Sequence, residues 1–187
     1  MRFIGFDPGL SGAIGVVTES GRFVEVHDMP TMSASKTSDK QKVNVPELAR
    51  ILRGIIGDGE VVAITEYVQP MPSIPGADGQ RRGMGSASAF SFGKSVGHIE
   101  ACVLTLGISL EWVTPVQWKK ALGLKSDKEQ CRSFAVSVFP GAPLGLKKHH
   151  GRAEALLIAR WYALKQRSDI EKATGFHSVA REGAPAT

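Results

Sequence analysis

The sequence predicts an α/β protein in which helices flank one mixed sheet of five strands. Two observations predict this class. The chain opens with three short apolar runs separated by turn residues, and afterwards apolar runs alternate with segments of helical period. With 187 residues, 42% of them hydrophobic and 22% charged, the composition is ordinary for one globular domain. We expect this domain to span residues 1–166 and residues 167–187 to form a flexible tail.

The strands are expected at residues 2–7, 12–18, 22–28, 61–66 and 109–113. Short segments that contain glycine join the first three, which favours an antiparallel meander. The last two follow helical segments and are expected to be parallel in the sheet. Between them, the polar residues 30–45 predict a mobile loop, with a short strand at its end as an option.

The helices are marked by caps and by the spacing of apolar residues. Pro46 opens a helix that ends at Gly57, and the last helix begins at His149 or His150. The other expected helices cover residues 86–106, begin at Thr114-Pro115, and begin at a capping box over Ser126–Glu129. Residues 69–88, with three prolines and four glycines, predict a long loop.

Small residues recur every four positions in the segment 86–106, at Gly93, Gly97 and Ala101. Such a stripe allows a close approach to another element. It is compatible with packing against the sheet and with pairing against a second copy of the chain, and the sequence does not decide between them.

Two apolar strands end on acids, Asp7 and Glu66. Aspartate is depleted in strand interiors, so an acid at this place needs a reason. Taken alone, each is compatible with a turn residue or a helix cap. Together they indicate a pair of carboxylates at one edge of the sheet.

The last helix adds two further candidates, His150 and Glu154. They lie four residues apart near its beginning and therefore share a face, whereas His149 faces elsewhere. A solvated basic helix end is the simpler interpretation of the two histidines. Carboxylates that converge repel each other unless cations neutralise them. Oxygen ligands suit Mg²⁺ or Mn²⁺, and two such ions together would support hydrolysis of a phosphodiester.

A net charge of +5 favours an anionic partner, of which nucleic acid is the commonest. Lysines at helix starts and arginines in the long loop are candidates for phosphate contacts, although a solvated surface is the default for each. The candidate DNA-binding residues are Lys119, Lys128, Arg81, Arg82 and Tyr67, the last as a stacking or a core residue. No apolar run approaches the roughly 20 residues needed to cross a bilayer, so no membrane association is expected.

Four segments together resemble the RuvC-type Holliday junction resolvases, especially the phage and organellar members. In chain order they are GFDPGLSGAIGVV, VVAITEYV, SASAFSFGKSVGHIEACVLTLGISLEWVTPVQWKKAL and HGRAEALLIARW. The resemblance covers about residues 1–166. It implies a ribonuclease H-like fold, a homodimer, and Mg²⁺-dependent nicking of branched DNA at two symmetry-related strands, with Mn²⁺ as a substitute. It also implies the cytoplasm of a bacterial or phage-infected cell, or an organellar DNA compartment.

By position, Asp7, Glu66 and Glu154 match acids of the family's catalytic site. His150 matches a position that is usually aspartate, which leaves the number and preference of metal ions open because a neutral ring replaces a charge. Lys119 and Lys128 match basic positions near the scissile phosphate. The segment after Glu66 is longer than in bacterial members, so their contacts with the junction centre are not transferable.

Three other functions are compatible with parts of the sequence. A less specific phage nuclease acting on forks, flaps or packaging intermediates is the nearest. A non-catalytic DNA-binding relative is suggested by His150. An actin-like kinase or ATPase also begins with a glycine-containing acidic hairpin, but it needs two such subdomains and a nucleotide cofactor, for which 187 residues leave no room.

Overall fold

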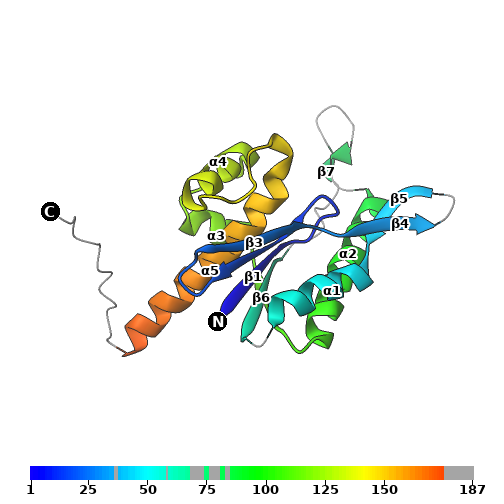
Figure 1. The fold of residues 1–187 in the computed structure, drawn as a ribbon. Helices are drawn as coiled ribbons and strands as arrows, with labels where there is room; N and C mark the ends of the chain where they lie inside the picture. Colours follow the sequence, from blue (N-terminus) through cyan, green and yellow to red (C-terminus); the bar gives the residue numbers. More distant parts are fainter. Residues whose placement is uncertain (36–37, 58, 68–73, 76–80, 83–84, 175–187) are drawn as a thin grey trace.

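The computed structural model describes residues 1–35, 38–57, 59–67, 74–75, 81–82 and 85–174. Its centre is a mixed five-stranded sheet in the order β3-β2-β1-β6-β9 (Figure 1). The strands are β1 (Arg2–Asp7), β2 (Ala13–Thr18), β3 (Phe23–Asp28), β6 (Val61–Glu66) and β9 (Ser109–Val113). The first three are antiparallel, and β6 and β9 run parallel to β1, as expected.

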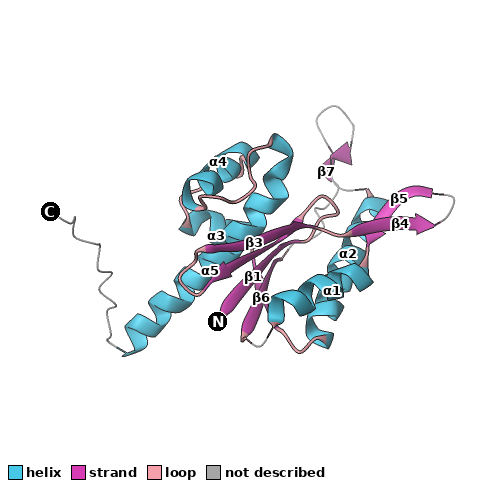
Figure 2. Cartoon of the chain, viewed as in Figure 1, coloured by secondary structure: helices cyan, strands magenta, loops and turns pink. Residues whose placement is uncertain are grey.

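Helices cover both faces of this sheet (Figure 2). One face carries α1 (Val45–Ile56) and α2 (Ser86–Thr105), which pack on Ile4, Phe6 and Ile14. The other carries α3 (Pro115–Ala121), α4 (Lys128–Val138) and α5 (His150–Thr174), which pack on Phe3 and Val17. The alternation of side chains along β1 therefore supplies two separate cores.

The long helix α5 packs directly against the backbone of two glycines at the centre of the sheet. Gly5 of β1 and Gly15 of β2 are paired in register beneath it. A Cβ added to Gly5 would lie 2.1 Å from the carbonyl oxygen of Ala155, and one on Gly15 would lie 2.6 Å from the nitrogen of Leu156. Glycine is required at both places because no side chain fits between strand and helix.

Local hydrogen bonds explain where the helices begin. Thr114 caps α3, as the sequence predicts, and it forms a reciprocal capping box with Gln117 that was not predicted. At α4 the cap is Asp127, whose carboxylate accepts the N–H of Gln130 at 2.7 Å, so the prediction of a box opening on Ser126 is wrong in register. A short 3₁₀ turn, η1 (Lys147–His149), leads into α5.

Residues 30–45 are more ordered than expected. They form an antiparallel hairpin of β4 (Thr31–Ser35) and β5 (Ser38–Val43). The prediction of a mobile loop is wrong because Met29 and Val43, at the base of this hairpin, are buried in the core and fix its two ends. The residues of this segment are polar because the two strands are exposed to solvent, not because the segment lacks regular structure.

The helix α5 extends into the first residues of the expected flexible tail. α5 continues through residues 167–174, where Arg167 and Glu171 form an ion pair of 3.0 Å one turn apart. Residues 175–187 lie outside the described part, and the domain limits stay a prediction. Of the expected loop 69–88, the structure describes the two-residue strands β7 (Ile74–Pro75) and β8 (Arg81–Arg82) and residues 85–88, the last three of which open α2. None of the described helices is long and apolar enough to cross a bilayer.

The contact between α5 and the sheet can be tested with Gly5→Ala. The added methyl group meets backbone that cannot move alone, so the free energy of unfolding should fall by about 3 kcal/mol or more. Gly54→Ala is the matched control, because a Cβ at Gly54 in α1 meets nothing within 4 Å. That variant should gain about 0.5–1 kcal/mol from helix propensity. Equal stabilities of the two variants in urea unfolding would contradict the proposed close packing.

Candidate active site

Two adjacent strands deliver the first two acids to one edge of the sheet. Asp7 is the last residue of β1 and Glu66 the last of β6, and Phe6 pairs with Thr65 in the parallel ladder between them. The turn after Asp7 is tight: a Cβ on Gly12 would lie 2.0 Å from the carbonyl oxygen of Asp7, so only glycine fits there. The carboxyl ends of parallel strands thus place both side chains together.

The beginning of α5 closes over this edge. A Cβ on Gly151 would lie 2.7 Å from the carbonyl oxygen of Ser11 and 3.0 Å from Oδ2 of Asp7. The first turn of the helix is therefore in contact with the hairpin that follows β1. Glu154, one turn further along α5, enters the same space, as the sequence spacing predicts.

Burial and neighbouring charges raise the proton affinity of two of the three acids, Asp7 and Glu66. Burial, and then the charges of Glu154 and Glu66, raise the pKa of Asp7 to about 7. Burial also raises the pKa of Glu66, and the charge of Glu154 acts in the same direction, whereas a hydrogen bond from Trp118 opposes it. The site is a desolvated negative cluster, which is stable as a charged set only with cations beside it.

Two neighbours on α3 hold the outer acids. The indole nitrogen of Trp118 donates to Oε1 of Glu66 at 2.8 Å, and Nζ of Lys119 donates to Oε1 of Glu154 at 2.9 Å. Lys119 and Glu154 are largely shielded from solvent, with side-chain exposures of 15% and 12%. Although burial opposes it, this hydrogen bond raises the pKa of Lys119, which stays charged.

Sequence reasoning found Lys119 but missed Trp118 as a site residue. The available signal was the indole N–H, because a buried tryptophan usually needs an acceptor. Trp118 is fully buried in the core beneath the site, and its ring lies 4.9 Å from Nζ of Lys119. It therefore orients Glu66 and supports Lys119 at once.

Arg152 is a second residue that sequence reasoning missed. Its guanidinium donates to both oxygens of Asp28 at 2.6 and 2.7 Å, and also to the carbonyl of Pro143 at 3.2 Å. These bonds tie the first turn of α5 to the end of β3 and to the segment before the helix. They hold the beginning of the helix that carries Glu154 in place.

The two histidines have different surroundings. Nδ1 of His149 accepts the N–H of Leu146 at 3.3 Å and so belongs to the 3₁₀ turn. Nδ1 of His150 is buried and has no hydrogen-bond partner among the described residues. A buried ring nitrogen without a partner is expensive unless something unobserved occupies it.

These residues fit a divalent cation. Within the described ranges, no three His, Cys, Asp or Glu side chains are grouped closely enough to hold an ion as they stand. The raised pKa of Asp7, the free Nδ1 of His150 and the side-chain-free approach of Gly151 nevertheless match what such an ion requires. Two of the acids have other partners in this arrangement, because Trp118 donates to Glu66 and Lys119 donates to Glu154.

The other predicted DNA-binding residues are placed to different degrees. The charge of Lys128, at the start of α4, lowers the pKa of Asp7 and therefore acts on the site. Tyr67 follows Glu66, is exposed, and meets the ring of Trp112 edge-on at 6.0 Å, so the alternative of a core residue is wrong. Arg81 and Arg82 form β8, and their side chains lie outside the described part.

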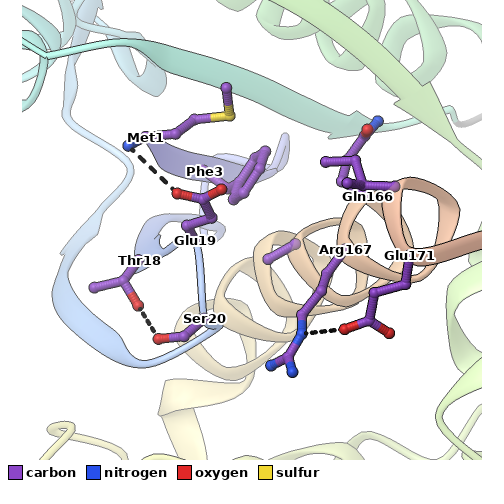
Figure 3. Close-up of a pocket in the computed structure, with 10 residues that line it drawn as sticks. Met1, Phe3, Thr18, Glu19, Ser20, Gln166, Arg167 and Glu171 are labelled. Carbon is purple, nitrogen blue, oxygen red and sulfur yellow. Dashed lines mark hydrogen bonds and ion pairs between the residues drawn. The ribbon is translucent and has the colours of Figure 1, made fainter. Parts of the chain in front are cut away.

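The cavity at the other end of the sheet lacks such chemistry (Figure 3). It measures about 640 Å³ and lies between Met1, Phe3 and the second half of α5. Most of its polar groups are engaged with one another: Thr18 bonds to Ser20, Met1 to Glu19 and Arg167 to Glu171. The acidic edge is therefore the better candidate for an active site.

The raised pKa of Asp7 predicts how stability depends on pH when chelator removes metal ions. Between the unfolded value of 3.8 and about 7, the folded protein keeps a proton that the unfolded chain releases. The free energy of unfolding should therefore fall as pH rises through this window. The total fall should be no more than about 4 kcal/mol, because each pKa unit corresponds to about 1.4 kcal/mol. Asp7→Asn should remove this loss and be the more stable protein at about pH 8.

Asp28→Asn is the control of opposite sign. The hydrogen bonds from Arg152 lower the pKa of Asp28, so its contribution is present at neutral pH and lost on acidification. This variant should be less stable than wild type at about pH 8. Parallel pH profiles of wild type and Asp7→Asn in denaturant titrations would contradict the buried cluster.

Comparison with known proteins supports the resemblance seen in the motifs. No family model matches the chain. The chloroplastic Holliday junction resolvase MOC1 of Chlamydomonas reinhardtii is 39% identical over 110 residues. The match covers 56% of this chain and 12% of that protein, so the chain corresponds to a small part of its curated relative.

The fold is similar to that of RuvC. Thermus thermophilus RuvC in complex with a Holliday junction substrate superposes with a TM-score of 0.60 at 19% identity, covering 90% of this chain and 96% of that one. A second structure of Thermus thermophilus RuvC gives 0.59 at 20% identity, with 90% and 97% covered. The expected ribonuclease H-like sheet is thereby confirmed: this chain has the RuvC fold, and its sequence resembles a Holliday junction resolvase.

Proposed function

We propose that this chain is a metal-dependent endodeoxyribonuclease that resolves four-way DNA junctions by paired symmetric nicks. The observation that carries the proposal is the gathering of Asp7, Glu66 and Glu154 from three separate elements at one sheet edge. Lys119 and Lys128 lie beside them, on a RuvC fold. The resolvase similarity of the curated relative supports branched DNA as the substrate.

The acids and His150 would hold Mg²⁺, or Mn²⁺ in its place, as a pair of ions. Such a pair supplies charge stabilisation to the attacking and leaving oxygens of a phosphodiester. The protein's own part is positioning: Trp118 fixes Glu66, and Arg152 fixes the turn that carries His150 and Glu154. Lys119 and Lys128 place positive charge where a phosphate would enter.

Shape, rather than base sequence, is the expected basis of substrate choice. Lysine contacts to phosphates set the position of DNA without reading bases. The exposed pair Tyr67 and Trp112, at the ends of β6 and β9, is available to stack on bases at a branch. We infer that the protein acts where branched DNA occurs, in a bacterial or phage-infected cell or in an organelle.

A homodimer would place two such sites on one junction. In α2 the buried residues Ser95, Ile99 and Val103 face the core. The opposite side exposes Phe90 and Leu104, at 71% and 53%, on either side of the small-residue stripe. A Cβ at Gly93 or Gly97 would meet nothing within 4 Å, so the alternative that these glycines pack against the sheet is wrong.

Cleavage of matched synthetic substrates tests the activity. Four-way junction, fork, flap and linear duplex should be compared in Mg²⁺ and Mn²⁺, and we expect paired symmetric nicks in the junction alone. Asp7→Asn should bind the junction but cut it roughly 100- to 10,000-fold more slowly. Equal cutting of forks and flaps would favour the less specific nuclease. Unchanged behaviour of Asp7→Asn would point to a non-catalytic DNA-binding protein.

Sedimentation at several protein concentrations tests the dimer. Wild type should sediment as a dimer, and Gly97→Arg should sediment as a monomer with an unchanged circular dichroism spectrum. Gly54→Arg is the matched control, since Gly54 is also an exposed helical glycine with open space around it, in α1. A monomeric wild type, or identical masses for the two variants, would exclude this interface.

A further inference from the structure

A basic groove lies directly beside the acidic edge, along α3 and the turn that follows it. Its volume is about 380 Å³. The residues that matter for its chemistry are three lysines and three apolar residues: Lys119, Lys120, Lys125, Pro115, Val116 and Leu124. The proposed mechanism uses only the first of these.

Two of the three lysines of the groove, Lys120 and Lys125, have no acidic partner within the described part of the chain, whereas Lys119 pairs with Glu154. None of the residues that line the groove is acidic, and neither Lys120 nor Lys125 forms an ion pair there. The two acids that follow the groove in sequence are engaged elsewhere, because Asp127 caps α4 and Glu129 pairs with Arg132. Exposed lysines without counter-charges attract an anion and gain by neutralising it.

Lys119 joins the groove to the active site. The same side chain lines the groove and touches Glu154 at 2.9 Å. An anion in the groove would therefore lie next to the acids rather than on a separate surface. This continuity favours a polyanion that runs from one place to the other over a small, free anion.

The apolar side of the groove fits the same ligand. Val116 is 72% exposed, an unusual position for a large aliphatic side chain, and Leu124 is partly exposed beside it. A nucleotide offers both kinds of partner, with phosphate oxygens for the lysines and sugar carbons for the aliphatic side chains. A bare metal ion or an acidic peptide would not use both sides in this way.

We propose that this groove binds the backbone of the DNA strand that is cut, at a phosphate flanking the scissile one, through Lys120 and Lys125. The inference rests on the proposed nuclease function and adds a contact to it. Because only phosphate and sugar are contacted, the groove contributes affinity and strand position and no base preference.

The test is the salt dependence of binding to a labelled four-way junction, by fluorescence anisotropy in EDTA so that nothing is cut. Over about 50–200 mM NaCl, Lys120→Gln/Lys125→Gln should reduce the slope of log affinity against log salt by about 2. The loss should be equal for junctions with different arm sequences.

The control removes the same charge from the opposite end of the sheet. Arg53→Gln/Lys172→Gln changes exposed residues near the ends of α1 and α5, and its slope should equal that of wild type. Val116→Asp should weaken binding about as much as the double lysine variant, whereas Val116→Thr should not. All of these side chains are exposed, so melting temperatures should stay at the wild-type value.

The outcomes separate the two proposals. If wild type binds and cuts junctions while the double lysine variant keeps the wild-type slope, the proposed DNA contact in the groove is wrong and the proposed nuclease function is retained. If both double variants lose the same slope, general charge accounts for it and the groove is again overturned. If wild type neither binds nor cuts any branched substrate, the proposed function fails, and the groove fails with it.

Discussion

The close packing of α5 on two glycines of the sheet is the constraint on which the rest of the structure depends. Gly5 and Gly15 bring the helix axis down onto the backbone of β1 and β2, and Gly151 does the same at its first turn. Only this close approach brings a carboxylate from the end of the chain to carboxylates on two strands. α4 and its neighbours then cover the outer side of the helix and complete the core.

The site that results is an electrostatic compromise. Burial favours neutral acids, while the proposed binding of metal ions requires them charged. The protein meets both demands by placing donors at fixed positions around the cluster: an indole N–H at Glu66, an ammonium at Glu154 and a guanidinium that holds the helix. Asp7 lies deepest and has no such side-chain donor among the described residues. Its pKa is therefore raised furthest, to about 7.

Much of the fold could be predicted because its signals are local. The strands that carry Asp7 and Glu66 are apolar runs bounded by turns, and the offset between His150 and Glu154 follows from helical geometry. What could not be predicted depends on partners distant in sequence. The hairpin of β4 and β5 is fixed by burial of Met29 and Val43, and the choice of Asp127 over Ser126 as a cap depends on the register of one turn.

The same holds for the site. Acids at the ends of strands can be recognised in a sequence, whereas the residues that orient them look ordinary. Trp118 reads as a core residue of a helix and Arg152 as a surface charge, because their acceptors, Glu66 and Asp28, come from other parts of the chain. The motifs therefore identified the candidate catalytic groups and left out two of the groups that position them.

The three acids are synthesised in the order of their positions in the chain, and this order determines when they can come together. During synthesis Asp7 and Glu66 emerge early, and the turn that carries Glu154 emerges last of the three. A nascent or truncated chain that lacks α5 would have neither the covering helix nor the final carboxylate. If the proposed function holds, the set of three acids is completed only when α5 has been synthesised and has packed on the sheet.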